Sequence, residues 1–238
     1  MREITKKNYV QNREQFILDK CRGKKVLHLG CCASPDTETI FGAGNSLFQN
    51  IEKICKVQQG LDIDKDAINY LHGKGYKNIS FFDLNSPGQV NFEPDIIVFA
   101  DTLEHLMNLE IALTSMKNLM NAKTELIITV PNATMFPRVV GNFKGFIQEN
   151  EDHKVSFTYS ALKQLLMFNQ LKVNNIILAR ELHIDNPFYL LQPKTYYSKI
   201  KRMVYNFLYK GIVFFFPLFS ECLIITSSLD KEKSNFKD

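Results

Sequence analysis

The chain has 238 residues, 45% of them hydrophobic and 23% charged, with a formal net charge of +4. That length suits one α/β domain with an appendage better than two independent domains, and the composition is typical of a soluble globular protein. So mild a positive charge gives no case for nucleic acid as a partner.

The cysteines and the apolar runs indicate the cellular compartment. Five cysteines without regular spacing do not predict a disulfide framework, and the absence of a CxxC pair gives no sign of zinc. The polar N-terminus lacks the apolar centre of a signal peptide. The longest apolar run, 211–219, contains Pro217 and is shorter than the roughly 18 residues that a transmembrane helix needs. We therefore expect a cytoplasmic protein.

The leading segment, 1–23, is charged and predicts a helix near 12–21. A short apolar run at 26–29 then ends at Gly30, which indicates a buried strand entering a tight turn. Ser34 followed by Pro35 predicts a helix start, with serine as N-cap and proline as the first helical residue.

Strand and helix patterns alternate through the rest of the chain with short connections, which predicts a parallel, doubly wound sheet. Further strands are expected at 57–63, 79–82, 94–100, 124–130, 172–179 and 221–227, and further helices at 46–55, around Ala67 to Leu71, at 109–121 and around Leu162 to Leu166. Asp64 and Asp66 precede one of these helices and are expected to cap it.

Four residues follow the first four strands of the predicted core: Gly30, Asp62, Asp83 and Asp101. Ligands of open α/β sheets bind at the carboxyl ends of the strands, so these residues should share one crevice. Glycine permits close backbone approach, and a carboxylate after the second strand can accept hydrogen bonds from both hydroxyls of a ribose. Asp83 and the Leu84 backbone could face an adenine amino group. The pattern predicts an adenosine-shaped slot.

A dinucleotide is disfavoured, because the glycine-rich GxGxxG turn is absent. Gly30 is followed by Cys31-Cys32-Ala33-Ser34, and a pyrophosphate needs close backbone approach across that turn. A sulfonium ligand without phosphates tolerates the change.

Five ordered motifs resemble those of the class I S-adenosylmethionine-dependent methyltransferases. They are Val26-Leu-His-Leu-Gly-Cys31, Gly60-Leu-Asp-Ile-Asp64, Phe82-Asp-Leu84, Ala100-Asp-Thr-Leu-Glu-His-Leu106 and Leu126-Ile-Ile-Thr-Val-Pro-Asn132. The fourth has the "LEHL" form of the ubiquinone-biosynthesis-like small-molecule branch, and Asp152-His153 with Phe157-Thr158 is similar to the stretch after strand five there. The resemblance covers about residues 24–180. The sequence differs from the family pattern at Cys32, where the family usually has glycine. This difference could change the affinity for the methionine part of the cofactor.

The resemblance implies an α/β, Rossmann-like, doubly wound sheet of seven strands, mostly parallel with an antiparallel last strand and helices on both faces. It implies S-adenosylmethionine over Gly30 and Cys31, its ribose on Asp62 and its adenine beside Asp83, with Asp101 and Thr102 near the methionine moiety. The full set of expected cofactor-binding residues is His28, Gly30, Cys31, Cys32, Asp62, Ile63, Asp83, Leu84, Asp101 and Thr102. One domain is expected over 1–238, with its cofactor-binding core at 24–180.

Three residues are candidates for catalysis: Glu104, His105 and His153. A hydroxyl acceptor must lose a proton, and histidine has a suitable pKa for that role. The alternatives are a loop held by backbone hydrogen bonds for Glu104 and His105, and a capping or surface role for His153. For His28, which lies inside a strand, the favoured alternative to a cofactor contact is a structural histidine. Glu104, His105 and Asp152 are residue types that can bind a metal, but no spacing forces them onto one face, so no metal is expected.

The stretch 186–220, between the last two strands, has no acidic residue, eleven aromatic residues and five basic ones: Lys194, Lys199, Lys201, Arg202 and Lys210. Ile200, Val204, Phe207 and Leu208 could form one apolar helix face. Such a basic amphipathic segment could rest on an anionic membrane surface. It could equally pack over the sheet or against a second subunit.

The sequence therefore predicts methyl transfer from S-adenosylmethionine to a small-molecule, sugar or lipid-linked acceptor, with oxygen favoured over nitrogen or carbon. The alternative is an S-adenosylmethionine-binding protein without transferase activity that acts in a complex, supported by the altered turn at Cys32. An NAD-dependent enzyme lacks its glycine turn, and a methyltransferase of nucleic-acid bases lacks a (D/N)PPY-type motif after the fourth strand.

Overall fold

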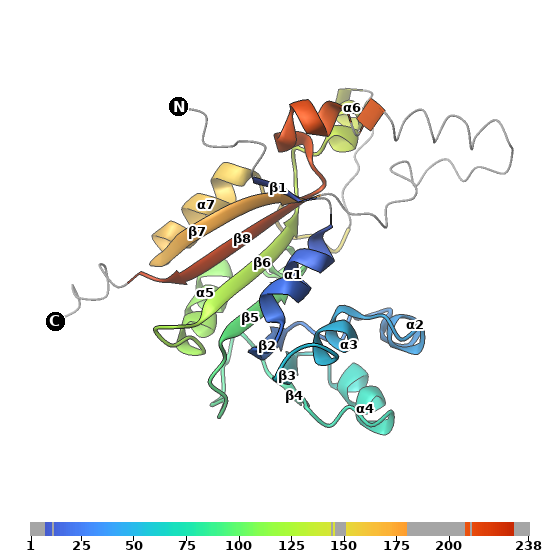
Figure 1. Cartoon of the computed structure of the whole chain (residues 1–238), viewed down its shortest axis with the longest axis vertical. Helices are drawn as coiled ribbons and strands as arrows, with labels where there is room; N and C mark the ends of the chain where they lie inside the picture. The colour runs from blue at the N-terminus through green and yellow to red at the C-terminus, as the bar shows by residue number, and fades with distance from the viewer. Residues whose placement is uncertain are drawn as a thin grey trace, which may run out of the picture.

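The computed structural model describes residues 8–10, 12–143, 145, 151–179, 208–209 and 211–230. Its centre is an eight-stranded sheet in the order β1-β7-β8-β6-β5-β2-β3-β4 (Figure 1). The strands are β1 Tyr9–Val10, β2 Lys25–Leu29, β3 Val57–Asp62, β4 Ile79–Phe81, β5 Ile96–Ala100, β6 Glu125–Pro131, β7 Leu171–Ala179 and β8 Cys222–Leu229.

The last strand, β8, runs antiparallel between β6 and β7, and every other pairing is parallel. This confirms the predicted mostly parallel sheet with an antiparallel last strand. The number of strands differs by one, because Tyr9 and Val10 add a short β1 beside Leu178 and Ala179. Two residues are too few to show the period of two that predicts a strand.

Seven α-helices and two short 3₁₀ helices have both ends within the described residues, and residues 208–209 and 211–215 are also helical. The complete helices are α1 Arg13–Cys21, α2 Thr37–Gly42, α3 Leu47–Glu52, α4 Lys65–Gly73, α5 Leu109–Asn118, α6 Phe136–Phe143, α7 Tyr159–Phe168, η2 Leu103–His105 and η3 Pro217–Phe219. Side-chain caps fix several of their starts. Asn12 caps α1, Thr158 caps α7, and Ser46 forms a reciprocal capping box with Gln49 at α3.

The predicted start of the helix after β2 is wrong. Ser34 is not its N-cap: α2 begins at Thr37 after Asp36, because Ala33 adopts a positive φ of 56° and extends the turn. The Ser34 hydroxyl instead donates a 2.6 Å hydrogen bond to the Asp64 carboxylate. Asp64 caps α4 as predicted, accepting from the backbone N–H groups of Asp66 and Ala67, whereas Asp66 lies in the first turn.

Alternation along the strands divides the core between the two faces of the sheet. In β5, Ile97 and Phe99 point to the face covered by α5 and α7, while Ile96 and Val98 point to the face covered by α1 and α3. A third cluster joins α2, α3 and α4 beside β3 and β4. Helices on both faces confirm the doubly wound class. None of the described helices has the length and apolarity to cross a membrane.

The strand order places the candidate site. The chain passes from β2 to β3 on one side and later returns to β5 on the other side of β2. This reversal is the topological switch point, where a crevice opens at the carboxyl ends of parallel strands. The predicted helix face of Ile200, Val204 and Phe207 and the tail 231–238 lie outside the described residues.

Candidate functional site

A crevice with two hollows lies at the switch point. The smaller hollow encloses about 80 Å³ between the ends of β3, β4 and β5. The larger one encloses about 500 Å³ between β2, β5 and the N-terminal ends of α1 and α3. Gly30, Asp62 and Thr102 line both hollows, so they meet on either side of the turn after β2.

Gly30 is required by its surroundings. It has a φ of +68°, and a Cβ built on it would lie 2.5 Å from Oγ1 of Thr102. No side chain larger than hydrogen fits there without moving Thr102, whose hydroxyl donates to the Ala100 carbonyl. The backbone of the turn therefore comes close to whatever occupies the crevice.

The Asp62 carboxylate is fixed by two backbone N–H groups. Cys32 N–H donates to one carboxylate oxygen at 2.8 Å, and Asp64 N–H donates to the other at 3.0 Å. A carboxylate offers about four acceptor positions, so two remain. These can accept two hydroxyls held side by side, which is the pattern that a ribose presents.

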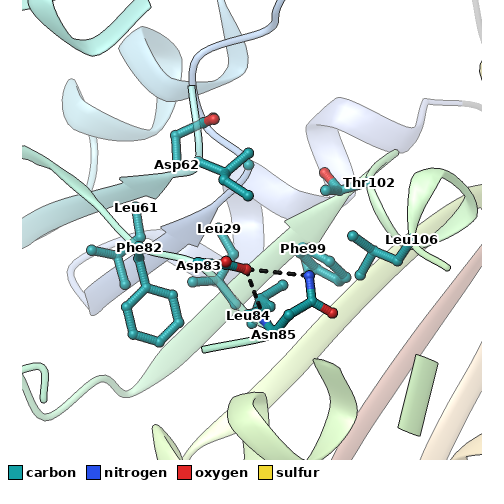
Figure 2. A pocket seen from close by; sticks show the side chains of 12 residues that line it. Leu29, Leu61, Asp62, Phe82, Asp83, Leu84, Asn85, Phe99, Thr102 and Leu106 are labelled. Carbon is teal, nitrogen blue, oxygen red and sulfur yellow. Dashed lines mark hydrogen bonds between the residues drawn. The ribbon is translucent and has the colours of Figure 1, made fainter. Parts of the chain in front are cut away.

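The smaller hollow is mostly apolar with a polar end (Figure 2). Leu29, Leu61 and Phe99 form its floor, and Asp83, which follows β4, turns toward Asn85. One oxygen of Asp83 accepts from the Asn85 backbone at 2.8 Å and from its side-chain amide at 3.2 Å. An apolar hollow with a carboxylate at its end suits a purine ring.

Leu84 and Ile63 border the same hollow, as predicted for cofactor-binding residues. The Ser115 hydroxyl of α5 donates a 2.6 Å hydrogen bond to the Leu84 carbonyl, which holds the loop after β4 in place. Ile63 is largely exposed and stands next to Asp62 at the mouth.

The two neighbouring cysteines differ in what they offer. Cys31 lines the larger hollow, whereas the Cys32 side chain is fully buried in the cluster of α2, α3 and α4. Cys32 therefore reaches the site through its backbone N–H. Burial, with smaller effects from Cys32 and Asp62, raises the pKa of the Cys31 thiol well above its ordinary range. Both cysteines are free and buried.

Asp101 closes the larger hollow from the end of β5. It has a φ of 47°, and its carboxylate accepts from the Thr129 hydroxyl at 3.0 Å and forms an ion pair with Arg13. Arg13 belongs to α1 and lines the same hollow. Arg13 was not predicted as a site residue, because no local sequence pattern indicates that the leading helix packs against β5.

Glu104, His105 and His153 meet at the far wall of the crevice. Their ligand atoms lie within 4.8 Å of one another, and the two histidine rings are 4.9 Å apart and nearly perpendicular. Nδ1 of His105 is 3.3 Å from the Asp152 carbonyl oxygen. The Glu104 side chain is buried, and its carbonyl accepts from the backbone of Lys154 and Val155. The fold thus brings together the three candidate catalytic residues, in a donor set that would also suit a divalent metal.

His28 lies inside β2 with its ring 6.0 Å from that of Phe48, and it lines the larger hollow. Its Nδ1 is buried without a hydrogen-bond partner among the described residues. Full burial lowers the pKa of His28 from 6.5 to about 4, so the ring is neutral near pH 7. The position is compatible with both predicted roles, a structural one and a contact to the ligand.

Ten residues are predicted from the sequence to bind the cofactor. Cys32 contributes only its backbone, and the other nine line the walls of the two hollows: His28, Gly30, Cys31, Asp62, Ile63, Asp83, Leu84, Asp101 and Thr102. Besides Arg13, polar residues such as Ser34, Ser46 and Asn85 line the hollows without having been predicted. These lie in loops without a repeating pattern.

No protein-family model matches the chain, and no curated protein matches it in sequence. Several solved structures are similar in fold. A putative methyltransferase of Haloferax volcanii, solved with the Trm112 methyltransferase activator, has 12% identity over 90% of this chain and 87% of its own, with a TM-score of 0.55. The magnesium protoporphyrin IX methyltransferase of Synechocystis, with bound S-adenosylhomocysteine, has 12% identity over 91% and 81%, with a TM-score of 0.54.

A third structure, an S-adenosylmethionine-dependent methyltransferase of Archaeoglobus fulgidus, has 18% identity over 90% of this chain and 94% of its own, with a TM-score of 0.50. Likenesses at these identities concern the fold alone. The chain has the Rossmann-like fold that these S-adenosylmethionine-dependent methyltransferases share.

Proposed function

We propose that the chain is an S-adenosylmethionine-dependent methyltransferase that acts on a hydroxyl of a small-molecule, sugar or lipid-linked acceptor. The observation that carries this proposal is the crevice divided by Gly30. It has an apolar slot on one side, a larger polar hollow on the other and the fixed carboxylate of Asp62 at the junction.

Adenosine fits the first hollow and the junction. Asp62 would accept the two ribose hydroxyls, and the adenine would lie over Leu29, Leu61 and Phe99 with its amino group toward Asp83. Gly30 would let the backbone approach the ligand where a Cβ has no room. The match supports a nucleoside ligand with no phosphate, because the turn lacks the glycines that surround a pyrophosphate.

The amino-acid end of the cofactor would lie in the larger hollow, near Arg13 and Asp101. A guanidinium pairs well with a carboxylate, and a carboxylate pairs with an ammonium, so the Arg13–Asp101 ion pair complements both charges of a zwitterion. We propose that the two side chains take these roles. Cys31 and Thr102, which line the same hollow, would lie beside the amino-acid end of the cofactor.

When bound, S-adenosylmethionine supplies a methyl group on a sulfonium that leaves as a neutral thioether. The chain's part is to orient the acceptor and to take its proton. The Asp152 carbonyl can only accept, so Nδ1 of His105 would carry a hydrogen, and Nε2 would be the base. We propose His105 as the base that takes the hydroxyl proton, with Glu104 and His153 as positioning residues.

The alternative, a cofactor-binding protein without transferase activity, had the altered turn at Cys32 as its support. In the structure, the Cys32 side chain points into the core and its N–H holds Asp62, so the change leaves the crevice open. This observation favours the enzyme. The activator complex of the Haloferax neighbour is a property of that protein and is compatible with both proposals.

The test is calorimetric titration with S-adenosylmethionine, S-adenosylhomocysteine and NAD. We expect micromolar binding of the two adenosyl ligands and none of NAD. Asp62→Ala should weaken adenosyl binding about a hundredfold, because it removes two hydrogen bonds to a charged group. Asp66→Ala is the matched control, since it removes an exposed carboxylate one turn away and should leave affinity unchanged. Failure of both adenosyl ligands to bind would overturn the proposal and leave only the fold.

Three finer expectations remain proposals beside this one: a single domain over 1–238, a cytoplasmic location, and contact of 186–220 with a membrane surface. Membership in the ubiquinone-biosynthesis-like branch also rests on the "LEHL" resemblance. An acceptor screen with the purified protein, using release of S-adenosylhomocysteine as the signal, would identify the acceptor and its atom.

A further inference from the structure

Two thiols and a carboxylate gather at the turn after β2. We call this set the thiol–carboxylate triad; it consists of Cys31, Cys32 and Asp62. The two sulfur atoms and a carboxylate oxygen all lie within 4.8 Å of one another. Both cysteines are free, and both of their side chains are buried. No step of the proposed methyl transfer uses either sulfur, so the triad is open to a second role.

The surrounding chain makes room for the triad and orients it. Gly60 of β3 has no side chain, and a Cβ built there would lie 2.6 Å from the sulfur of Cys31. The Asp62 carboxylate is held by the backbone N–H groups of Cys32 and Asp64, at 2.8 and 3.0 Å. Outer hydrogen bonds of this kind orient the ligands of a metal ion, and each carboxylate oxygen keeps a further acceptor position.

An ion can reach the triad from the crevice. Cys31 and Asp62 both line the larger hollow, which encloses about 500 Å³. Cys32 is fully buried among the packed side chains of α2, α3 and α4. Apolar packing on this side keeps water away from the sulfur atoms, and a low dielectric strengthens the attraction between a cation and its ligands.

The donor atoms of the triad suit a thiophilic divalent cation such as Zn²⁺. Thiolate ligands select soft ions, whereas Mg²⁺ and Ca²⁺ prefer oxygen ligands. Zinc bonds of about 2.3 Å to sulfur and about 2.1 Å to oxygen place tetrahedral ligands roughly 3.6–3.8 Å apart. Small rotations of side chains whose donor atoms already lie within 4.8 Å of one another would reach that spacing. Three protein ligands leave the fourth position to water.

We propose that the thiol–carboxylate triad binds a thiophilic divalent cation, and that this ion and an adenosyl ligand exclude each other. Binding of the ion releases one proton from each thiol to the solvent. The two thiolates, the carboxylate and the ion then carry a single negative charge in total. This equals the charge of the carboxylate beside two neutral thiols, so the ion adds no net charge to the buried turn.

The mutual exclusion rests on the proposed function, in which Asp62 accepts the ribose hydroxyls, but the cation site does not. A carboxylate oxygen that is bound to the ion is no longer available to a hydroxyl. S-adenosylmethionine and S-adenosylhomocysteine carry the same ribose, so the ion should weaken the binding of both alike. By thermodynamic linkage, each adenosyl ligand should weaken the binding of the ion by the same factor.

The first test uses Cd²⁺ as a spectroscopic probe of the full chain, because cadmium thiolates absorb in the ultraviolet. We expect a saturable absorption that Zn²⁺ abolishes by competition. Cys32→Ala should weaken cadmium binding about tenfold or more, because it removes one of the two sulfur ligands. Cys31→Ala removes the other sulfur and serves as a second variant, and urea unfolding shows that each variant is folded. Cys55→Ser is the matched control, since Cys55 is free, partly exposed and outside the triad.

The second test is calorimetric titration with each adenosyl ligand in saturating Zn²⁺ and in EDTA. We expect the dissociation constants of both ligands to rise about tenfold or more in Zn²⁺. In Cys32→Ala, where the ion is bound weakly, the same concentration of Zn²⁺ should leave them unchanged.

An absence of cadmium–thiolate absorption in the wild type would overturn the cation site, as would its persistence in both Cys31→Ala and Cys32→Ala or its loss in Cys55→Ser. A zinc effect on adenosyl binding that persists in Cys32→Ala would place the ion elsewhere and overturn the exclusion at Asp62. Lack of adenosyl binding in EDTA would instead be a failure of the proposed function, because the cadmium absorption decides the cation site independently.

Discussion

Within the turn after β2, position 30 requires glycine whereas position 32 does not. At Gly30 the φ is positive and Thr102 leaves no room for a Cβ. Cys32 has no positive φ, and its side chain fills the cluster of α2, α3 and α4. The Asp62 carboxylate accepts only a backbone N–H from position 32, which any residue except proline supplies. A side chain is therefore tolerated at this position without closing the crevice.

His105 carries the sharpest prediction at this scale. If it is the base, His105→Gln should lower kcat by about 10² or more and leave the affinity for S-adenosylmethionine unchanged. Single-turnover assays with a screened acceptor would measure both.

Two further measurements define that result. His72→Gln is the control, because His72 of α4 contacts the Ile79 carbonyl of β4 and lines neither hollow. Full activity of the wild type in EDTA would argue against a metal held by Glu104, His105 and His153. A wild-type kcat in His105→Gln would rule out His105 as the base and would mean that the chain accelerates the reaction by positioning alone.

At the scale of elements, the loops that build the site also start the helices. Asp62 ends β3, and two residues later Asp64 caps α4 while it accepts from Ser34 of the turn after β2. The Ala67 N–H and the Ser34 hydroxyl, with the Asp66 N–H, lower the pKa of the Asp64 carboxyl. The cap therefore links the loop after β3 to the turn after β2 and helps to hold the Asp62 carboxylate in place.

Asp64→Ala should lower the free energy of unfolding by about 1 kcal/mol at pH 7, the usual effect of losing an N-cap. Asp64→Asn keeps the capping oxygen and should cost only a few tenths of a kcal/mol. The folded pKa lies below the unfolded value of 3.8, so the charge-dependent part of the stability is present above that pH and is lost below it. Urea unfolding at pH 7 and pH 3 measures both effects.

The wild type and Asp64→Asn should therefore differ less in stability at pH 3 than at pH 7. An equal difference at the two pH values would contradict the ionised cap. Loss of several kcal/mol in Asp64→Asn would mean that the carboxylate does more than cap the helix.

At the scale of the whole molecule, periodicity and the ordered motifs predicted the alternating strands, the antiparallel last strand and the edge of the sheet at which the crevice opens. They succeed because the apolar strands and their terminal residues depend on short stretches of sequence. Arg13 and β1 were missed because their places depend on how a leading segment packs against β5 and β7. The start of α2 was wrong because a positive φ at Ala33, which no local pattern reveals, lengthens the turn.

The buried His28 of β2 should make the free energy of unfolding of the whole molecule depend on pH in the acidic range. Burial lowers its folded pKa to about 4 while the unfolded value is 6.5, so the unfolded chain binds the proton more readily. The corresponding stability is complete above pH 6.5 and is lost progressively as the pH falls toward 4, by roughly 3 kcal/mol. His28→Leu removes this titration while keeping an apolar side chain beside Phe48, so its unfolding free energy should fall less over the same window. Thermal or urea unfolding of both proteins from pH 7.5 to 4 measures the difference, and parallel curves would show that His28 is not held neutral in the folded protein.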